Sequence, residues 1–227
     1  MLTKLLTIKR NTMNKIKISI LALTLLFSFS CKRKIENVSE VITASYPIIT
    51  INGAQFVSIP VGGTFVDAGA TAVDTLLNEN LTAISITNDI DATTPGFYTV
   101  QYKFKNSNGY TSTGTRFVLV TDVSDTLDYS GLYLRTTNSA PMNVAKVAPG
   151  LYSTDNVGGV PLPSAFAITV YFGQIDDSTL VVPNQPTTAG DMYCVNSFVK
   201  ATASDTIITW AVRNASFGTA QRTFSHQ

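Results

Sequence analysis

From residue 47 to the end of the chain, apolar residues recur at every second position in short runs that turn-forming residues separate. The clearest run is Phe97–Lys105, in which apolar and polar side chains alternate from Tyr98 onward. Such alternation is typical of a β-strand with one buried face and one wet face. The pair Asn108-Gly109 follows and favours a tight hairpin, because both residues tolerate positive φ angles. No part of this region keeps helical spacing over three turns, so we expect an all-β fold.

The expected strands fall into two groups, on either side of the polar segment Asp122–Asp128. The first group, residues 47–122, has about seven short strands with a turn every eight to twelve residues or so, which predicts a β-sandwich. Its clearest strands are 48–51, 56–61, 82–87, 97–105 and 110–120. The second group, residues 123–227, has candidate strands at 132–135, 144–147, 165–172, 179–182, 192–195, 198–202, 206–213 and 220–224. We therefore expect a β-sandwich followed by a second antiparallel β-sandwich or barrel-like domain.

Residues 1–30 predict a signal peptide. An uncharged run of thirteen residues, Ile18–Ser30, follows Lys15 and Lys17. A membrane-spanning helix needs roughly 20 apolar residues, so this shorter run matches the core of a secretory signal. Met13 offers a second start site, because the shorter signal that begins there keeps both lysines.

The uncharged run ends in the segment Leu26–Cys31, which resembles the lipobox of bacterial lipoproteins. The resemblance implies that signal peptidase cuts before Cys31 and that acyl chains are attached to its sulfur and its new amino group. At about 0.8 kcal/mol per buried methylene, two or three such chains anchor a protein stably to a membrane. Residues 31–46 then serve as a tether. Two alternatives stay open: ordinary secretion, and a disulfide between Cys31 and Cys194, although the strand-like surroundings of Cys194 favour a buried thiol.

The charge pattern excludes several classes of protein. The net charge is +1, but residues 1–30 contain basic residues and no acidic ones, so the rest of the chain is acidic. An acidic folded part repels nucleic acid, which excludes a nucleic-acid binder. With two cysteines, one histidine and 14% charged residues, the chain matches neither a zinc-finger array nor a disulfide-stapled miniprotein.

Two motifs in the first group of strands carry a family resemblance. The segment Gly63–Asp74 has a glycine, an aromatic residue, Asp-x-Gly-Ala and then Ala-x-Asp, and Thr94–Tyr102 contains Gly-x-Tyr-x-Val-x-Tyr. Together they resemble the bacterial immunoglobulin-like domain named after pesticidal crystal proteins, over roughly residues 47–122. Ala68 departs from the family, which usually has proline there. The resemblance implies an immunoglobulin-like β-sandwich that acts as a spacer or adhesion module and has no catalytic residues.

The residues needed for catalysis or metal binding do not form a recognisable motif. The single histidine, His226, lies next to the end of the chain, so a histidine-activated nucleophile is not expected. Asp67, Asp74, Asp89 and Asp91 offer oxygen ligands to calcium, but no dense calcium loop is present and aspartates in loops commonly bind turn backbone. We expect no enzyme activity, no bound metal and no cofactor.

A second resemblance concerns the C-terminal group of strands. The segment Gly150–Gly159, with Ile208-Thr209-Trp210 further on, resembles the C-terminal domain of lipoproteins encoded near starch-utilisation-type uptake systems. It implies an accessory role in polysaccharide uptake, with a polysaccharide or oligosaccharide as ligand and outer-membrane uptake proteins as further partners.

The candidate ligand-binding residues combine aromatic faces with amide and carboxylate groups, because a sugar ring has an apolar face and a rim of hydroxyls. They are Tyr152, Asp155, Asn156, Asn184, Gln185 and Trp210. Tyr152 either stacks on a ligand or closes the edge of a sheet. Trp210 alternates in phase with Ile208 and Val212, which favours a core position and leaves a sugar platform as the alternative. If both rings are buried, the main reason for the glycan-binding hypothesis is lost.

The sequence therefore predicts a non-catalytic lipoprotein of the cell envelope, anchored to the outer membrane by lipid at Cys31. The main hypothesis for its function is glycan binding as an accessory of a polysaccharide-uptake system. The alternative is a structural or adhesive surface module that binds other proteins. Because Lys32-Arg33-Lys34 stands where some surface-exported lipoproteins carry acidic residues, both faces of the membrane stay open.

Overall fold

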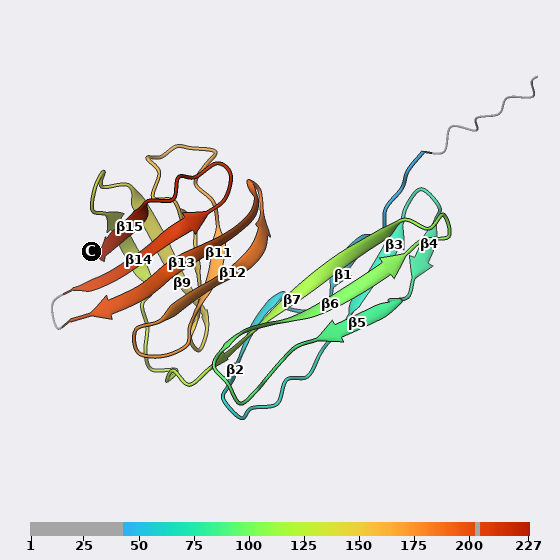
Figure 1. The fold of residues 1–227 in the computed structure, drawn as a ribbon, viewed down its shortest axis with the longest axis horizontal. Coiled ribbons are helices and arrows are strands. Elements are labelled where there is room, and N and C mark those ends of the chain that lie inside the picture. The colour runs from blue at the N-terminus through green and yellow to red at the C-terminus, as the bar shows by residue number, and fades with distance from the viewer. Residues whose placement is uncertain (1–42, 203–204) are drawn as a thin grey trace, which may run out of the picture. The chain divides into compact units, whose positions relative to one another are not determined.

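The computed structural model describes residues 43–202 and 205–227, which form fifteen strands and no helix (Figure 1). The expected signal peptide, Cys31 and most of the expected tether lie outside the described residues. All fifteen strands belong to one compact unit, Ala44–Gln227. Within the described part of the chain, no helix is long and apolar enough to cross a membrane. The all-β fold class is confirmed.

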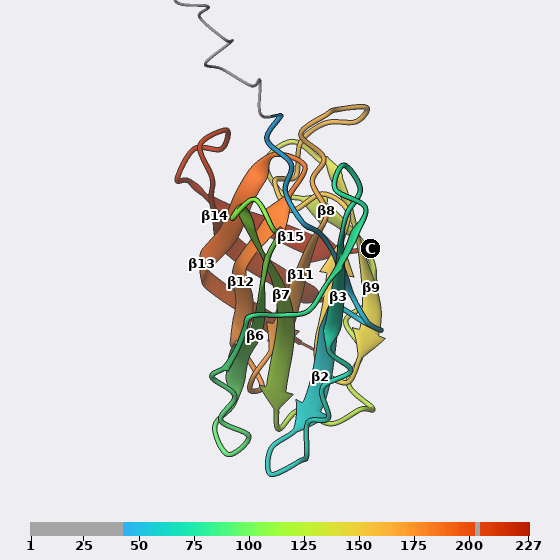
Figure 2. The same cartoon turned by 90° about the vertical axis from the view of Figure 1, so that its right-hand side faces the viewer.

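The first seven strands form two sheets that pack as a sandwich. One sheet has the order β1-β3-β4, and the other has the order β2-β7-β6-β5. The strands are β1 (Ile48–Ile51), β2 (Phe56–Pro60), β3 (Ala70–Asp74), β4 (Glu79–Leu81), β5 (Ser85–Asn88), β6 (Gly96–Lys105) and β7 (Thr111–Thr121). Figure 2 shows the two longest, β6 and β7, side by side as an antiparallel pair. β2 pairs with β7 in parallel, as the edge strand of an immunoglobulin-like sandwich can.

The alternation that predicted β6 also sets its buried face. Val100, Tyr102 and Phe104 point into the sandwich core, and the residues between them are exposed. The predicted hairpin is confirmed as well, because Gly109 has a φ of +90° and its N–H donates to the carbonyl oxygen of Asn106 (3.0 Å).

Two predictions for the sandwich are wrong in detail. Only residues 85–87 of the expected strand 82–87 lie in a strand, β5, whereas residues 82–84 connect it to β4 of the other sheet. The strand β3 was not expected, because its Ala-Thr-Ala-Val-Asp sequence has no aromatic residue and only Thr71 and Val73 favour a strand. Asp74 ends β3 with a buried carboxylate, to which Asn106 donates a hydrogen bond of 2.7 Å.

The remaining eight strands form a closed barrel in which each strand pairs with the next and the last pairs with the first. The strands are β8 (Gly131–Arg135), β9 (Pro141–Ala148), β10 (Leu151–Thr154), β11 (Val170–Gln174), β12 (Leu180–Thr187), β13 (Gly190–Ala201), β14 (Thr206–Arg213) and β15 (Gln221–His226). Every pairing is antiparallel, so this is an up-and-down barrel. Of the two architectures expected for the second domain, the barrel is the one observed.

Three strands of the barrel differ from expectation. β10 lies in the segment Gly150–Gly159, where no strand was expected, and residues 165–169, expected in a strand, form a loop instead. β13 is a single strand of 12 residues where two strands were expected, with a register shift between Val195 and Phe198 at the expected break.

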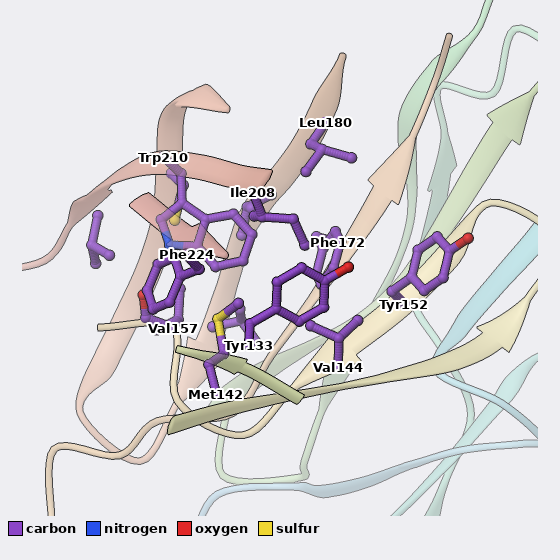
Figure 3. Close-up of a cluster of buried hydrophobic side chains, with 14 of the residues drawn as sticks. Tyr133, Met142, Val144, Tyr152, Val157, Phe172, Leu180, Ile208, Trp210 and Phe224 are labelled. Atoms are coloured by element: carbon purple, nitrogen blue, oxygen red, sulfur yellow. Dashed lines mark hydrogen bonds between the residues drawn. The ribbon is translucent and has the colours of Figure 1, made fainter. Parts of the chain in front are cut away.

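Aromatic side chains fill the barrel (Figure 3). The rings of Phe172 and Phe224 lie 5.4 and 5.7 Å from the ring of Trp210, and Tyr133 is equally buried. An eight-stranded barrel has an interior that side chains can fill, and the buried side chains of this barrel form one hydrophobic core cluster.

The sandwich and the barrel share a small core of their own. The ring of Phe56 stacks between Phe117 (4.6 Å between centroids) and Tyr171 of β11 (4.1 Å). Beside it, the hydroxyl of Thr121 donates to the carbonyl oxygen of Gln174 (2.7 Å), and both residues are buried. The two groups of strands therefore belong to one packed unit.

Candidate functional site

Tyr152 and Trp210 do not lie at a surface. Both side chains are 0% exposed inside the barrel, so neither can stack on a sugar, and this part of the site prediction is wrong. The Tyr152 hydroxyl donates to the carbonyl oxygen of Leu127 (3.1 Å), and Trp210 Nε1 donates to that of Val157 (2.9 Å). The core alternative for Trp210 is therefore the correct one, because every residue of β14 from Ile208 to Val212 is buried.

The polar candidates are divided between structural and exposed positions. Asn156 and Gln185 are buried, and each forms hydrogen bonds to backbone that fix a loop or a neighbouring strand. Asp155 and Asn184 are exposed, but Asp155 already accepts two hydrogen bonds from Asn143. The predicted group is not brought together as a binding site.

The aspartates considered for calcium bind turn backbone and neighbouring side chains. Asp67 accepts from the N–H of Gly69, and Asp91 accepts from the N–H of Thr93. Asp89 accepts from the N–H of Thr99. Among the described residues, no group of three or more acidic, histidine or cysteine side chains is placed to hold a metal ion.

Burial changes the ionisation of the interior tyrosines and of the cysteine. It raises the pKa of Tyr152 to about 12 and that of Tyr133 further, and it is also the main reason that the pKa of Tyr102 is raised to about 12. Burial likewise raises the pKa of the Cys194 thiol to about 12, which agrees with its expected role as a small hydrophobic residue.

The raised pKa values of these tyrosines predict that the folded protein loses stability at alkaline pH. Their pKa values are above the usual value near 10 in the folded state only, so the stability they contribute is complete below about pH 10 and is lost as the pH rises towards 12. We expect an alkaline absorbance titration to show Tyr102, Tyr133 and Tyr152 ionising well above pH 10, together with loss of β circular dichroism. Ionisation of these three tyrosines near pH 10 with the fold intact would contradict their burial.

A group of aromatic and arginine side chains lies where two loops of the barrel meet. The loop 155–169, after β10, carries Phe166, which is 50% exposed. The loop 214–220, after β14, carries Phe217, whose ring meets Phe166 edge-on with the centroids 6.3 Å apart. The guanidinium carbon of Arg222, on β15, lies 5.5 Å from the centre of the Phe217 ring. We call this group the aromatic–arginine cluster; its members are Phe166, Phe217, Arg135, Arg213 and Arg222.

Two glycines hold this cluster together. The carbonyl oxygen of Gly158 accepts from Arg222 Nε (3.1 Å) and from Arg135 Nη1 (3.3 Å). Arg135 Nη1 also donates to the carbonyl oxygen of Gly159 (3.2 Å). The ring of Phe217 fills the space that a Cβ on Gly158 would need, so this close approach requires glycine.

The arginines of the cluster have carbonyl partners and no acidic ones. Arg222 is 7% exposed and donates to the carbonyl oxygens of Gly158 (3.1 Å) and Ala220 (3.0 Å). Burial lowers the pKa of Arg222, and the neighbouring Arg135 lowers it further. The ion pairs found in the described part of the chain involve Arg116 and Lys146, so no described carboxylate pairs with Arg135, Arg213 or Arg222.

The sequence analysis did not identify this cluster. Phe166 stands in a segment interpreted as a strand, and Phe217 in a short polar segment between two strands. An aromatic residue surrounded by Ser, Ala and Gly outside any strand is the signal that could have found both of them.

An open hollow with a volume of about 710 Å³ lies elsewhere, where the segment before the barrel meets the loop after β11. It is lined by Asp122, Val123, Ser124, Thr126, Leu127, Asp176, Asp177 and Ser178. Asp176 is already engaged there, because it accepts hydrogen bonds from the N–H groups of Ser178 and Thr179, which lower its pKa. The hollow has no exposed aromatic ring, unlike the aromatic–arginine cluster.

Comparison with protein families identifies the sandwich. Residues 49–120 match the family described as "Bacterial surface protein, Ig-like domain". The immunoglobulin-like resemblance is therefore confirmed at this level. No curated protein matches the chain.

Several solved structures resemble the chain at low identity. A lipoprotein, BT2262 from Bacteroides thetaiotaomicron, is 21% identical over 80% of this chain and 100% of its own, with a TM-score of 0.36. The M60 catalytic domain of ZmpB from Clostridium perfringens, with its CBM51-1 and CBM51-2 domains, is 14% identical over 81% of this chain and 21% of its own, with a TM-score of 0.28. A structure of CBM51-2 in complex with GlcNAc and INT domains, from the same ZmpB, is 14% identical over 79% of this chain and 43% of its own, with a TM-score of 0.28.

Proposed function

We propose that the chain is a non-catalytic, lipid-anchored protein of the bacterial cell envelope whose barrel binds a glycan at the aromatic–arginine cluster. In this proposal acyl chains on Cys31 hold the protein on the outer membrane, and the bacterial surface Ig-like domain acts as a spacer that carries the barrel. The glycan is supplied to, or received from, outer-membrane uptake proteins.

The observation that carries this proposal is the exposed ring of Phe166. It is 50% exposed and packs against Phe217, so that it offers apolar surface beside a second ring. The nearby guanidinium of Arg222 supplies hydrogen-bond donors. An apolar ring beside polar donors suits a pyranose, which has one apolar face and a rim of hydroxyls. The cluster thus takes the place of Tyr152 and Trp210 as the candidate glycan site, because both of those side chains are buried and cannot contact a sugar.

The test is an affinity gel with residues 44–227, the piece that contains every described strand and core cluster. We expect at least one polysaccharide in a broad panel to retard the protein. Phe166→Ala should weaken this binding at least about tenfold, because one central aromatic contact is commonly worth more than 1 kcal/mol. Phe198→Ala is the matched control, since Phe198 is also a half-exposed phenylalanine of the barrel, at 41%, and lies outside the cluster.

The alternative function, a structural or adhesive module that binds other proteins, is favoured by a different observation. Strand β5 pairs on one side only, with β6, and all four of its residues are exposed. Ile84 and Ile86 add apolar side chains at this edge. An unprotected edge strand of this kind can accept a further strand from a partner. If no polysaccharide retards the protein, this alternative takes precedence.

A further inference from the structure

We infer that the aromatic–arginine cluster selects an acidic saccharide, with the carboxylate or sulfate group of the sugar bound among Arg135, Arg213 and Arg222. This inference rests on the proposed function and names the class of glycan. Three independent features of the cluster carry it: its unpaired charge, its unused donors and its exposed ring.

The first feature is the charge. Arg135 and Arg222 donate to the same carbonyl oxygen, that of Gly158, so their positive charges are neighbours. Arg213, the last residue of β14, donates to the carbonyl oxygen of Thr219 (3.2 Å), in the loop that carries Phe217. Charges that are buried in proteins are normally paired, because an unpaired buried charge is costly. Acidic residues outnumber basic ones in the described part of the chain, yet none of them pairs with these three arginines there.

The second feature is the set of donors that remains. Among the described residues, Arg222 uses Nε and Nη1 and Arg213 uses Nη1, while their Nη2 groups have no hydrogen-bond partner. A guanidinium with free N–H groups binds a carboxylate or a sulfate in a two-pronged manner that a neutral hydroxyl cannot reproduce. The cluster therefore has both the charge and the geometry to hold an anion.

The third feature connects the anion to a sugar. The guanidinium of Arg222 lies over the ring of Phe217, and the ring of Phe166 stands almost perpendicular to that ring, with the two centroids 6.3 Å apart. Phe217 therefore connects the exposed ring of Phe166 to Arg222. A small inorganic anion has no apolar face that could stack on this ring. A uronic acid or a sulfated sugar can stack on it while its acidic group faces the arginines.

The experiment uses residues 44–227 in affinity gels with probes that differ in charge alone. Polygalacturonate is compared with its methyl ester, and dextran sulfate with dextran; the first pair tests recognition of a carboxylate and the second tests recognition of a sulfate. Poly-glutamate serves as an anionic polymer without sugar. We expect retardation by at least one acidic polysaccharide, little retardation by its neutral counterpart, and weaker binding as salt rises from about 50 mM to about 300 mM.

The variants test the arginines directly. Arg213→Gln should weaken binding of the acidic polysaccharide at least about tenfold, because it removes the charge and the two-pronged donor. Arg213→Lys keeps the positive charge but loses the two parallel N–H donors of the guanidinium, so this variant should bind the acidic polysaccharide less well than the unaltered protein. It should also fold even if Arg213→Gln does not. Lys200→Gln is the matched control, because Lys200 is an exposed cation on β13 outside the cluster. This variant should bind the acidic polysaccharide as well as the unaltered protein does.

The possible failures can be told apart. Equal retardation by the neutral and acidic members of a pair, unaffected by the Arg213 variants, would overturn the acidic class and leave glycan binding in place. If poly-glutamate binds as well as the acidic polysaccharide, the inference that the ligand is a saccharide is wrong and the cluster is a general anion site. If no polysaccharide binds at all, the proposed function fails together with this inference.

Discussion

Replacing Trp210 with alanine is expected to lower the free energy of unfolding by about 3–5 kcal/mol, the usual cost of deleting a large buried ring. Trp210 is 0% exposed and packs against Phe172 and Phe224, so its removal leaves a cavity that the closed barrel cannot easily collapse. It also leaves the carbonyl oxygen of Val157 without the donor that now lies 2.9 Å away. Because Trp210 is the single tryptophan of the chain, unfolding in urea should be followed by circular dichroism and not by fluorescence.

Two companion variants separate a core role from a binding role. Phe198→Ala removes a half-exposed ring from the same barrel and should cost about 1 kcal/mol or less. Trp210→Phe keeps most of the ring volume, so it should cost less than Trp210→Ala and leave glycan binding unchanged. Loss of binding in a fully folded Trp210→Phe variant would mean that the ring touches the ligand, against its burial in the barrel.

The sequence predicted the sandwich better than the barrel, and the reason lies in how many faces of a strand are buried. In β6 one face is wet, so the alternation of Val100, Tyr102 and Phe104 with polar residues reveals the inward side. In β14 both faces are covered, from Ile208 to Val212, and alternation then carries no information. The phase of Trp210 with its neighbours favoured a core position, but the burial of the whole strand depends on barrel closure.

The binding cluster could not be predicted because its members are distant in the chain. Phe166 and Phe217 lie in different loops, and the packing of both loops over the same part of the barrel brings them together. No local motif records this approach. The glycine pair was noticed, but as part of a family resemblance; its actual role is to supply carbonyl oxygens to Arg135 and Arg222. Tyr152 was misplaced for a related reason, since the glycines around it concealed the short strand β10.

Replacing Gly159 with alanine is expected to lower the free energy of unfolding by about 2–4 kcal/mol, which combines overpacking with a left-handed backbone. Gly159 has a φ of +55°, and a Cβ there would lie 2.6 Å from Cδ of Arg135 and 2.7 Å from Cε1 of Phe224. Real side chains do not approach so closely, so either the arginine or the ring must move. Because the carbonyl oxygen of Gly159 also accepts from Asn138, the displaced loop should weaken binding of the acidic glycan as well. Urea unfolding and the affinity gel measure the two effects.

Gly190→Ala is the control that separates the cost of overpacking in Gly159→Ala from the cost of a left-handed backbone. Gly190 has a φ of +88°, but a Cβ there would meet nothing closer than Asn214 Nδ2, at 3.9 Å. Its backbone is at least as unfavourable for alanine as that of Gly159, so any greater loss in Gly159→Ala comes from the contact with Arg135 and Phe224. Equal losses in the two variants would mean that backbone strain accounts for both. A Gly159→Ala variant that is as stable as the unaltered protein and binds as well would contradict the close packing of this loop against the arginines, on which the binding site depends.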